Sequence, residues 1–95
     1  MRRIQRKRTG GWRKPANCVY VGRGSDWGND AKISEKVTRE QAIEAFREKL
    51  SLMDEPLLRI WLKPLHGKDI CCWCREDEAC HGDVLIELCK RLGVE

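Results

Sequence analysis

The densest chemistry in the sequence lies between residues 71 and 83, where four cysteines and a histidine fall within a few positions of one another. Thiolates and imidazole are the preferred ligands of zinc, so Cys72, Cys74, Cys80 and His81 form an alternative metal-binding set. Their spacing disfavours that interpretation. In an extended strand, Cys72 and Cys74 lie about 6.6 Å apart at the backbone, whereas two sulfurs on one zinc ion lie about 3.8 Å apart. Only a bent chain could close this gap, and no metal or other cofactor is therefore favoured.

Cys80 is the candidate nucleophile of the cluster. It falls where a C-terminal helix is expected to begin, and the unpaired amides and dipole of a helix start lower the pKa of a thiol there. His81 follows directly, but adjacent helical side chains diverge and make a poor pair of nucleophile and base. The same histidine could donate to an anion or cap its own turn. Whether the protein is an enzyme is left open.

A second group of candidates lies on a glycine-rich loop, residues 22–30. Arg23 stands between two glycines and carries a planar guanidinium suited to phosphate or carboxylate. Trp27 could stack on a base, and Asn29 could read its edge. The alternative is that Trp27 closes the end of the core while Asn29 closes a turn. Trp61 and Trp73, within apolar segments, are expected in the core.

The basic charge gathers at the N-terminus. Residues 1–14 carry seven basic side chains and no acidic one, whereas residues 15–95 carry 12 basic and 15 acidic side chains. We therefore divide the chain into a basic arm, 1–14, and a single domain, 15–95. The arm is either a solvated tail or a phosphate-binding segment in which Trp12 and Arg13 would contact the ligand.

These candidates need elements to position them. Residues 17–21 and 68–74 have strand character, and a capping-box pattern at Thr38 precedes an apolar periodicity typical of a helix. Further helices are expected from Asp54 to Leu62 and from His81 to Leu92. A strand, a helical crossover and a second strand predict an α/β fold, with a small and mostly parallel sheet of two or three strands and three flanking helices. The third strand is expected around Ile4 or residues 31–34, or from a partner chain in a homodimer.

Ligands of parallel sheets gather beyond the carboxyl ends of the strands. The loop after Val21 and the loop after Cys74 should therefore lie side by side. The stretch around Trp27 and the start of the C-terminal helix are expected to form two walls of one anion-holding pocket. The chain has 95 residues, 41% of them hydrophobic and 36% charged, and no apolar run of the roughly 20 residues that cross a bilayer. A cytoplasmic protein without membrane contact is expected, in the host cytoplasm if a phage encodes it.

The motifs also resemble a known family. They include Gly11-Trp12, Val19-Tyr20-Val21-Gly22-Arg23, Trp27-Gly28-Asn29, Cys72-Trp73-Cys74 and Cys80-His81-Gly82-Asp83. Together they resemble the domain of unknown function numbered 4326, which is common in bacteriophage and bacterial genomes. Family members usually continue the tryptophan motif with proline and phenylalanine, where this chain has Asp30 and Ala31. The resemblance implies a compact α/β domain and a phage context, without an assigned activity. It implies functional roles at Arg23, Trp27, Asn29, Cys72, Cys74, Cys80 and His81.

The favoured hypothesis is a small phage-type protein that binds an anionic, nucleotide-like ligand and sequesters a host nucleotide immune signal. Arg23 and the amides at the start of the last helix would hold phosphate, Trp27 would stack on the base, and Asn29 and His81 would supply directional hydrogen bonds. The alternatives are an enzyme that uses Cys80 on a nucleotide-like substrate, a zinc-binding module, and a nucleic-acid-binding module that uses the basic arm.

Overall fold

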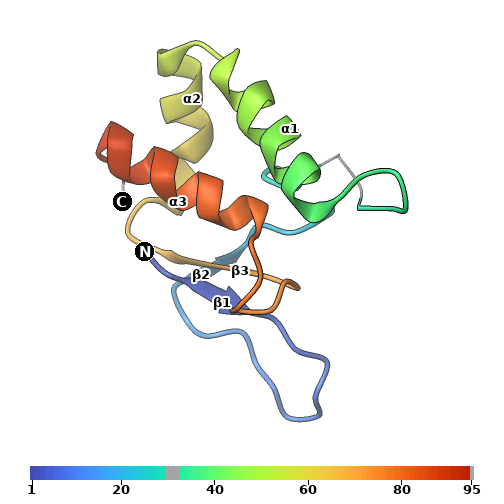
Figure 1. The fold of residues 1–95 in the computed structure, drawn as a ribbon. Coiled ribbons are helices and arrows are strands. Elements are labelled where there is room, and N and C mark those ends of the chain that lie inside the picture. Colours follow the sequence, from blue (N-terminus) through green and yellow to red (C-terminus); the bar gives the residue numbers. More distant parts are fainter. Residues whose placement is uncertain (30–32, 95) are drawn as a thin grey trace.

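The computed structural model describes residues 1–29 and 33–94, which form a small sheet covered on one side by helices (Figure 1). The strands are β1 (Arg3–Gln5), β2 (Cys18–Tyr20) and β3 (Asp69–Cys72). The helices are α1 (Arg39–Ser51), α2 (Glu55–Leu62) and α3 (His81–Leu92), with a short 3-10 helix, η1 (Lys63–Leu65), after α2. The expected α/β fold is confirmed.

The sheet is parallel throughout, in the order β1-β3-β2. β3 is therefore the central strand, and it pairs Ile70 with both Arg3 and Val19. The third strand lies around Ile4, which confirms one of the two predicted positions. The other, residues 31–34, falls partly outside the described residues, and its described members, 33 and 34, are not in a strand. Three residues of the predicted basic arm thus belong to the sheet.

All three helices lie on the same face of the sheet, and the connection from β1 to β2 extends away from them (Figure 1). On the helical side, Ile70 and Cys72 pack with the inner faces of α1, α2 and α3 in one hydrophobic core. Because strand side chains alternate, Cys71 points to the opposite face, in register with Ile4 and Tyr20. The two neighbouring cysteines of β3 therefore serve different faces of the sheet.

The first helix begins as its sequence predicts. Thr38 Oγ1 accepts a hydrogen bond from the Gln41 amide at 3.1 Å, and the Gln41 side chain accepts one from the Thr38 amide at 2.9 Å. This reciprocal pair is the capping box, which satisfies two amides that the helix itself leaves unpaired. It places Arg39 in the first turn of α1, beside the loop that carries Cys74.

The last helix begins with a second capping box, in which the cap is a cysteine. Cys80 Sγ accepts a hydrogen bond from the Gly82 amide at 3.4 Å, and Asp83 Oδ2 accepts one from the Cys80 amide at 3.0 Å. At the other end, Gly93 closes α3 in the left-handed conformation, with a φ of 69°. Cys80 is fully buried by this arrangement, with 1% of its surface exposed.

β3 ends at Cys72, two residues earlier than the predicted strand. Trp73 and Cys74 form a bend and leave the sheet. The expectation that Trp73 belongs to the core is therefore wrong: it lies beyond the strand, 39% exposed. None of the helices in the described part of the chain has the length and apolarity that a bilayer crossing requires.

Candidate functional site

A pocket of about 440 Å³ lies beyond the carboxyl ends of β2 and β3. Gly22, Arg23 and Asn29 line it from the loop after β2, and Cys80 and His81 line it from the start of α3. The two segments expected to face each other therefore do so. A direct hydrogen bond joins them, since the Nε2 atom of His81 lies 2.8 Å from the carbonyl oxygen of Val21.

This hydrogen bond determines the tautomer of His81. A carbonyl oxygen only accepts, so Nε2 carries a proton, and in the neutral imidazole Nδ1 is then an acceptor. The Nδ1 atom lies 3.6 Å from Cys80 Sγ. The ring is packed edge to face on Phe46, with ring centres 5.2 Å apart, which fixes its orientation. His81, in α3, is thus held at the wall of the pocket by α1 and by Val21, the residue directly after β2.

The loop after β2 folds back on itself in two tight turns. Ser25 donates from both its amide and its hydroxyl to the carbonyl of Gly22, at 3.1 and 2.6 Å. Gly28 then passes so close that a Cβ atom at that position would lie 2.8 Å from the Gly22 carbonyl oxygen. Only glycine tolerates this approach without a shift of the backbone. The loop is therefore a compact wall with Arg23 at its outer edge.

The structure places Trp27 outside the pocket lining. Its Nε1 donates to the carbonyl of Trp61 at 3.0 Å, and Trp61 Nε1 in turn donates to the carbonyl of Asp26 at 3.2 Å. Trp27 also packs against the hydrophobic core. This reciprocal pair fixes the loop to α2, which corresponds to the alternative in which Trp27 closes the end of the core.

Asn29 both anchors the loop after β2 and lines the pocket. Its Nδ2 donates to the carbonyl of Ala42 at 2.8 Å, which fastens the loop to α1. It also lines the pocket. Arg23, by contrast, is exposed, and no ion pair or hydrogen bond of its guanidinium occurs within residues 1–29 and 33–94. Of the predicted binding residues, Arg23 is therefore the one with an available cation at the pocket.

Sequence patterns did not predict Arg39, which stands on the opposite wall. Its Nη1 donates to Cys74 Sγ at 3.5 Å and to the Ala79 carbonyl at 3.1 Å. Its Nη2 pairs with Glu78 at 3.1 Å. The signal that could have found it is its place directly after the Thr38 cap, because the first turn of a crossover helix often faces the carboxyl edge of the sheet.

Three of the six cysteines form the floor of the pocket. The Sγ atoms of Cys72, Cys74 and Cys80 all lie within 4.8 Å of one another, and those of Cys72 and Cys80 are 3.2 Å apart. Hydrogen bonds from the Cys72 and Cys80 thiols, followed by the charge of Arg39, hold the pKa of Cys74 well below its usual value. The same thiol contacts raise the pKa of Cys80. The guanidinium of Arg39 beside Cys74 therefore favours a thiolate on Cys74 rather than on the predicted nucleophile Cys80.

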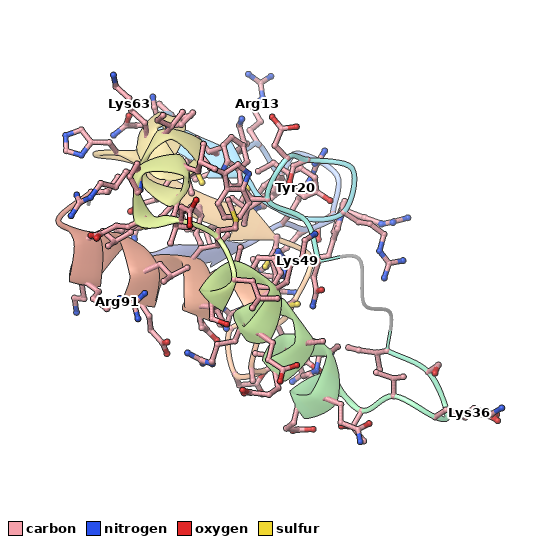
Figure 2. The ribbon with its side chains drawn as sticks, turned by 90° about the horizontal axis from the view of Figure 1, so that it is seen from above. Arg13, Tyr20, Lys36, Lys49, Lys63 and Arg91 are labelled. Carbon is pink, nitrogen blue, oxygen red and sulfur yellow. The ribbon has the colours of Figure 1, made fainter. Side chains whose placement is uncertain are left out.

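Of the two remaining predicted binding residues, Trp12 lies in a second groove and Arg13 does not line it. Trp12 lines it with basic side chains of residues 6–14, while Arg13 is exposed and extends outward from the molecule (Figure 2). The two pockets share Tyr20 and Trp73. Arg6 lies over both of these rings, 5.0 and 4.9 Å from their centres, and Arg8 lies 4.7 Å from the centre of Trp73. Cation–π contacts thus bind the basic segment to the edge of the sheet.

The fold and the site define a class of protein: a small α/β domain with a pocket at the carboxyl edge of a parallel sheet, floored by cysteines and flanked by arginines. The chain matches the family model described as "Domain of unknown function (DUF4326)" over residues 4–91, and it belongs to this family. The curated proteins and the solved structures contain no significant match to it.

Proposed function

We propose that the protein binds a small anionic, nucleotide-like ligand in the pocket between the loop after β2 and the start of α3. The observation that carries this proposal is the charge of the lining. Arg23 and Arg39 line the pocket, and no acidic side chain does so within the described residues. Next to it, the groove adds four further basic side chains, again with no acidic one in the described lining: Arg6, Lys7, Arg8 and Lys14.

The remaining lining suits a ligand with both an anionic and an aromatic part. Arg23 is the available guanidinium for phosphate, and the start of α3 presents its dipole to the same space. Tyr20 and Trp73, which is 39% exposed, take the stacking role that the sequence suggested for Trp27. Asn29 and His81 contribute directional hydrogen bonds. A volume of about 440 Å³ lies in the range of pockets for small ligands.

Binding without turnover would sequester such a ligand. In a phage context, we propose that the ligand is a host nucleotide signal and that its capture counters host defence.

The test is a thermal-shift and calorimetric panel of nucleoside mono-, di- and triphosphates and cyclic dinucleotides. We expect at least one of them to stabilise the protein. Arg23→Ala should reduce the affinity for that ligand by about 10–100-fold, which corresponds to the loss of one charge-assisted contact. The matched control is Arg13→Ala, which removes an exposed arginine outside the pocket. Absence of any stabilisation, or equal losses in the two variants, would refute the proposal.

A second candidate function rests on the neighbouring groove. Its alternation of Arg6, Arg8 and Lys14 with Trp12, Tyr20 and Trp73 is the pattern that holds single-stranded nucleic acid by charge and stacking. Deletion of residues 1–14 is unsuitable as a test because it removes β1. The double variant Arg8→Ala and Lys14→Ala leaves the sheet intact and should reduce the salt dependence of binding. Binding that does not respond to salt would exclude this function.

A further inference from the structure

The cysteine cluster has a geometry that the sequence alone argued against. An extended chain would separate Cys72 and Cys74 by about 6.6 Å at the backbone, too far for one metal ion. The strand instead ends at Cys72 and the chain bends, which brings Cys74 Sγ back toward Cys72 and toward Cys80 at the start of α3. The observation that disfavoured a metal site is therefore removed.

The distances among the three sulfurs bracket those of a metal centre. The sulfurs of Cys72 and Cys80 are 3.2 Å apart, and every pair lies within 4.8 Å. Zinc–sulfur bonds of about 2.3 Å in a tetrahedron separate the sulfurs by about 3.8 Å. Each of these sulfur pairs thus lies within about 1 Å of that separation.

The surroundings supply positive charge and donors for thiolates. Arg39 donates to Cys74 Sγ at 3.5 Å, and the Gly82 amide donates to Cys80 Sγ at 3.4 Å. Hydrogen bonds from outer groups to ligand sulfurs are typical of metal centres, where they orient the ligands and spread their charge.

The loop between Cys74 and Cys80 is held in place from a distant strand. Arg3, in β1, donates from Nη1 to the carbonyl of Arg75 at 3.2 Å and from Nη2 to those of Glu76 and Glu78 at 3.2 and 2.7 Å. Its Nε donates to Asp83 in the first turn of α3 at 3.0 Å. The cluster is thus preorganised by contacts that do not involve the sulfurs.

We propose that Cys72, Cys74 and Cys80 bind one zinc ion through three thiolates, with the fourth position facing the pocket. Three soft thiolates select zinc over the hard cations that prefer oxygen. All three cysteines line the pocket, so the remaining position is open to water, to His81 Nδ1 or to a bound ligand. Open fourth positions distinguish zinc sites that act on ligands from purely structural ones. This proposal does not depend on the nucleotide-like ligand.

The first test is elemental analysis of protein purified under reducing conditions without chelator. We expect one zinc per chain, or one after reconstitution with zinc chloride. Replacement by Co²⁺ should produce strong thiolate-to-cobalt charge transfer and the visible bands of a tetrahedral site. Iron in place of zinc, no metal after reconstitution, or a disulfide between Cys72 and Cys80 in reduced preparations would overturn the proposal.

Variants separate ligation from folding. Cys74→Ser changes the least buried of the three and should lose the zinc while the circular dichroism spectrum is retained. Cys72→Ala and Cys80→Ala should also lose it. The matched control is Cys71→Ala, which alters a fully buried cysteine next to Cys72 on the other face of the sheet and should keep the full zinc content. Equal zinc content in Cys74→Ser and Cys71→Ala would contradict three-thiolate binding. Ligand binding by the same variants, measured with the nucleotide panel, tests the nucleotide proposal independently of the zinc content.

Discussion

Replacement of Arg3 by alanine should destabilise the protein far more than its position near the N-terminus indicates. The Arg3 side chain is only 10% exposed and makes four hydrogen bonds to residues more than 70 positions away. Two of these, to Asp83 and to the Glu78 carbonyl, are partly buried. The carbonyls of residues 75 and 76 are exposed and can recover a water molecule when the guanidinium is removed.

The expected loss follows from the two partly buried bonds. Hydrogen bonds to a charged group contribute about 1.5–3 kcal/mol each, and the exposed ones contribute little. Arg3→Ala should therefore lower the free energy of unfolding by about 3 kcal/mol, a large part of the roughly 5–15 kcal/mol of a small domain. Arg3→Lys keeps the charge beside Asp83 but not the fork to the carbonyls, and should recover about a third of the loss.

The assay is urea denaturation followed by circular dichroism, with Arg2→Ala as the matched control. Arg2 is the preceding residue, and its side chain is 75% exposed in a 3.6 Å ion pair with Asp69. Its replacement should cost less than about 0.5 kcal/mol. If the two variants unfold at the same urea concentration, Arg3 does not hold the loop between Cys74 and Cys80, and the argument for a preorganised cluster fails.

Three further predictions concern other parts of the fold. Thr38→Ala removes the side-chain cap of α1 and should lower the free energy of unfolding by about 1 kcal/mol in the same assay. Thr9→Ala, at an exposed loop position, is the control and should be neutral; equal effects of the two variants would contradict the capping role. Trp27→Phe keeps an apolar ring but loses the hydrogen bond to the Trp61 carbonyl, so the free energy of unfolding should fall by about 1 kcal/mol while ligand affinity is unchanged. A loss of ligand affinity would show instead that Trp27 contacts the ligand. Burial, followed by the neighbouring Cys71, raises the pKa of Cys18 to about 11 from 9.0. Because the folded protein then holds the proton more tightly than the unfolded chain, stability should be intact below pH 9 and fall toward pH 11, more steeply than in Cys18→Ala; identical pH profiles would refute this.

Local patterns in the sequence predicted most of the fold. The capping box at Thr38, the proline near the start of α2 and the apolar stripe of α3 are short-range signals, and the helices begin where these signals lie. β1 was harder to assign, because its three residues include two polar side chains and pair only with β3, far along the chain. The rule that ligands bind beyond the carboxyl ends of parallel strands then predicted that the loop after β2 and the start of α3 lie close together.

The details of the site depend on contacts between distant residues. No glycine or proline marks the bend at Trp73 and Cys74, so the sequence indicated a strand that continues through Cys74. The bend is held by Arg3 and Arg39, which come from other elements. Trp73 was predicted in the core because of its apolar neighbours, yet Arg6 and Arg8 cover its ring at the surface. The indole N–H groups of Trp27 and Trp61 likewise donate to backbone carbonyls, from the loop to α2 and from α2 to the loop. No rule of sequence spacing predicts this pairing.

The most direct test of the binding proposal is a crystal structure with bound ligand. The protein is purified rapidly at low salt, and its crystals are soaked with the nucleotide that gives the largest thermal shift. The account predicts density for a phosphate-bearing molecule between Arg23 and His81, with its aromatic part against Tyr20 or Trp73. A ligand bound only along the basic groove of residues 6–14, or density in neither place at saturating nucleotide, would contradict it.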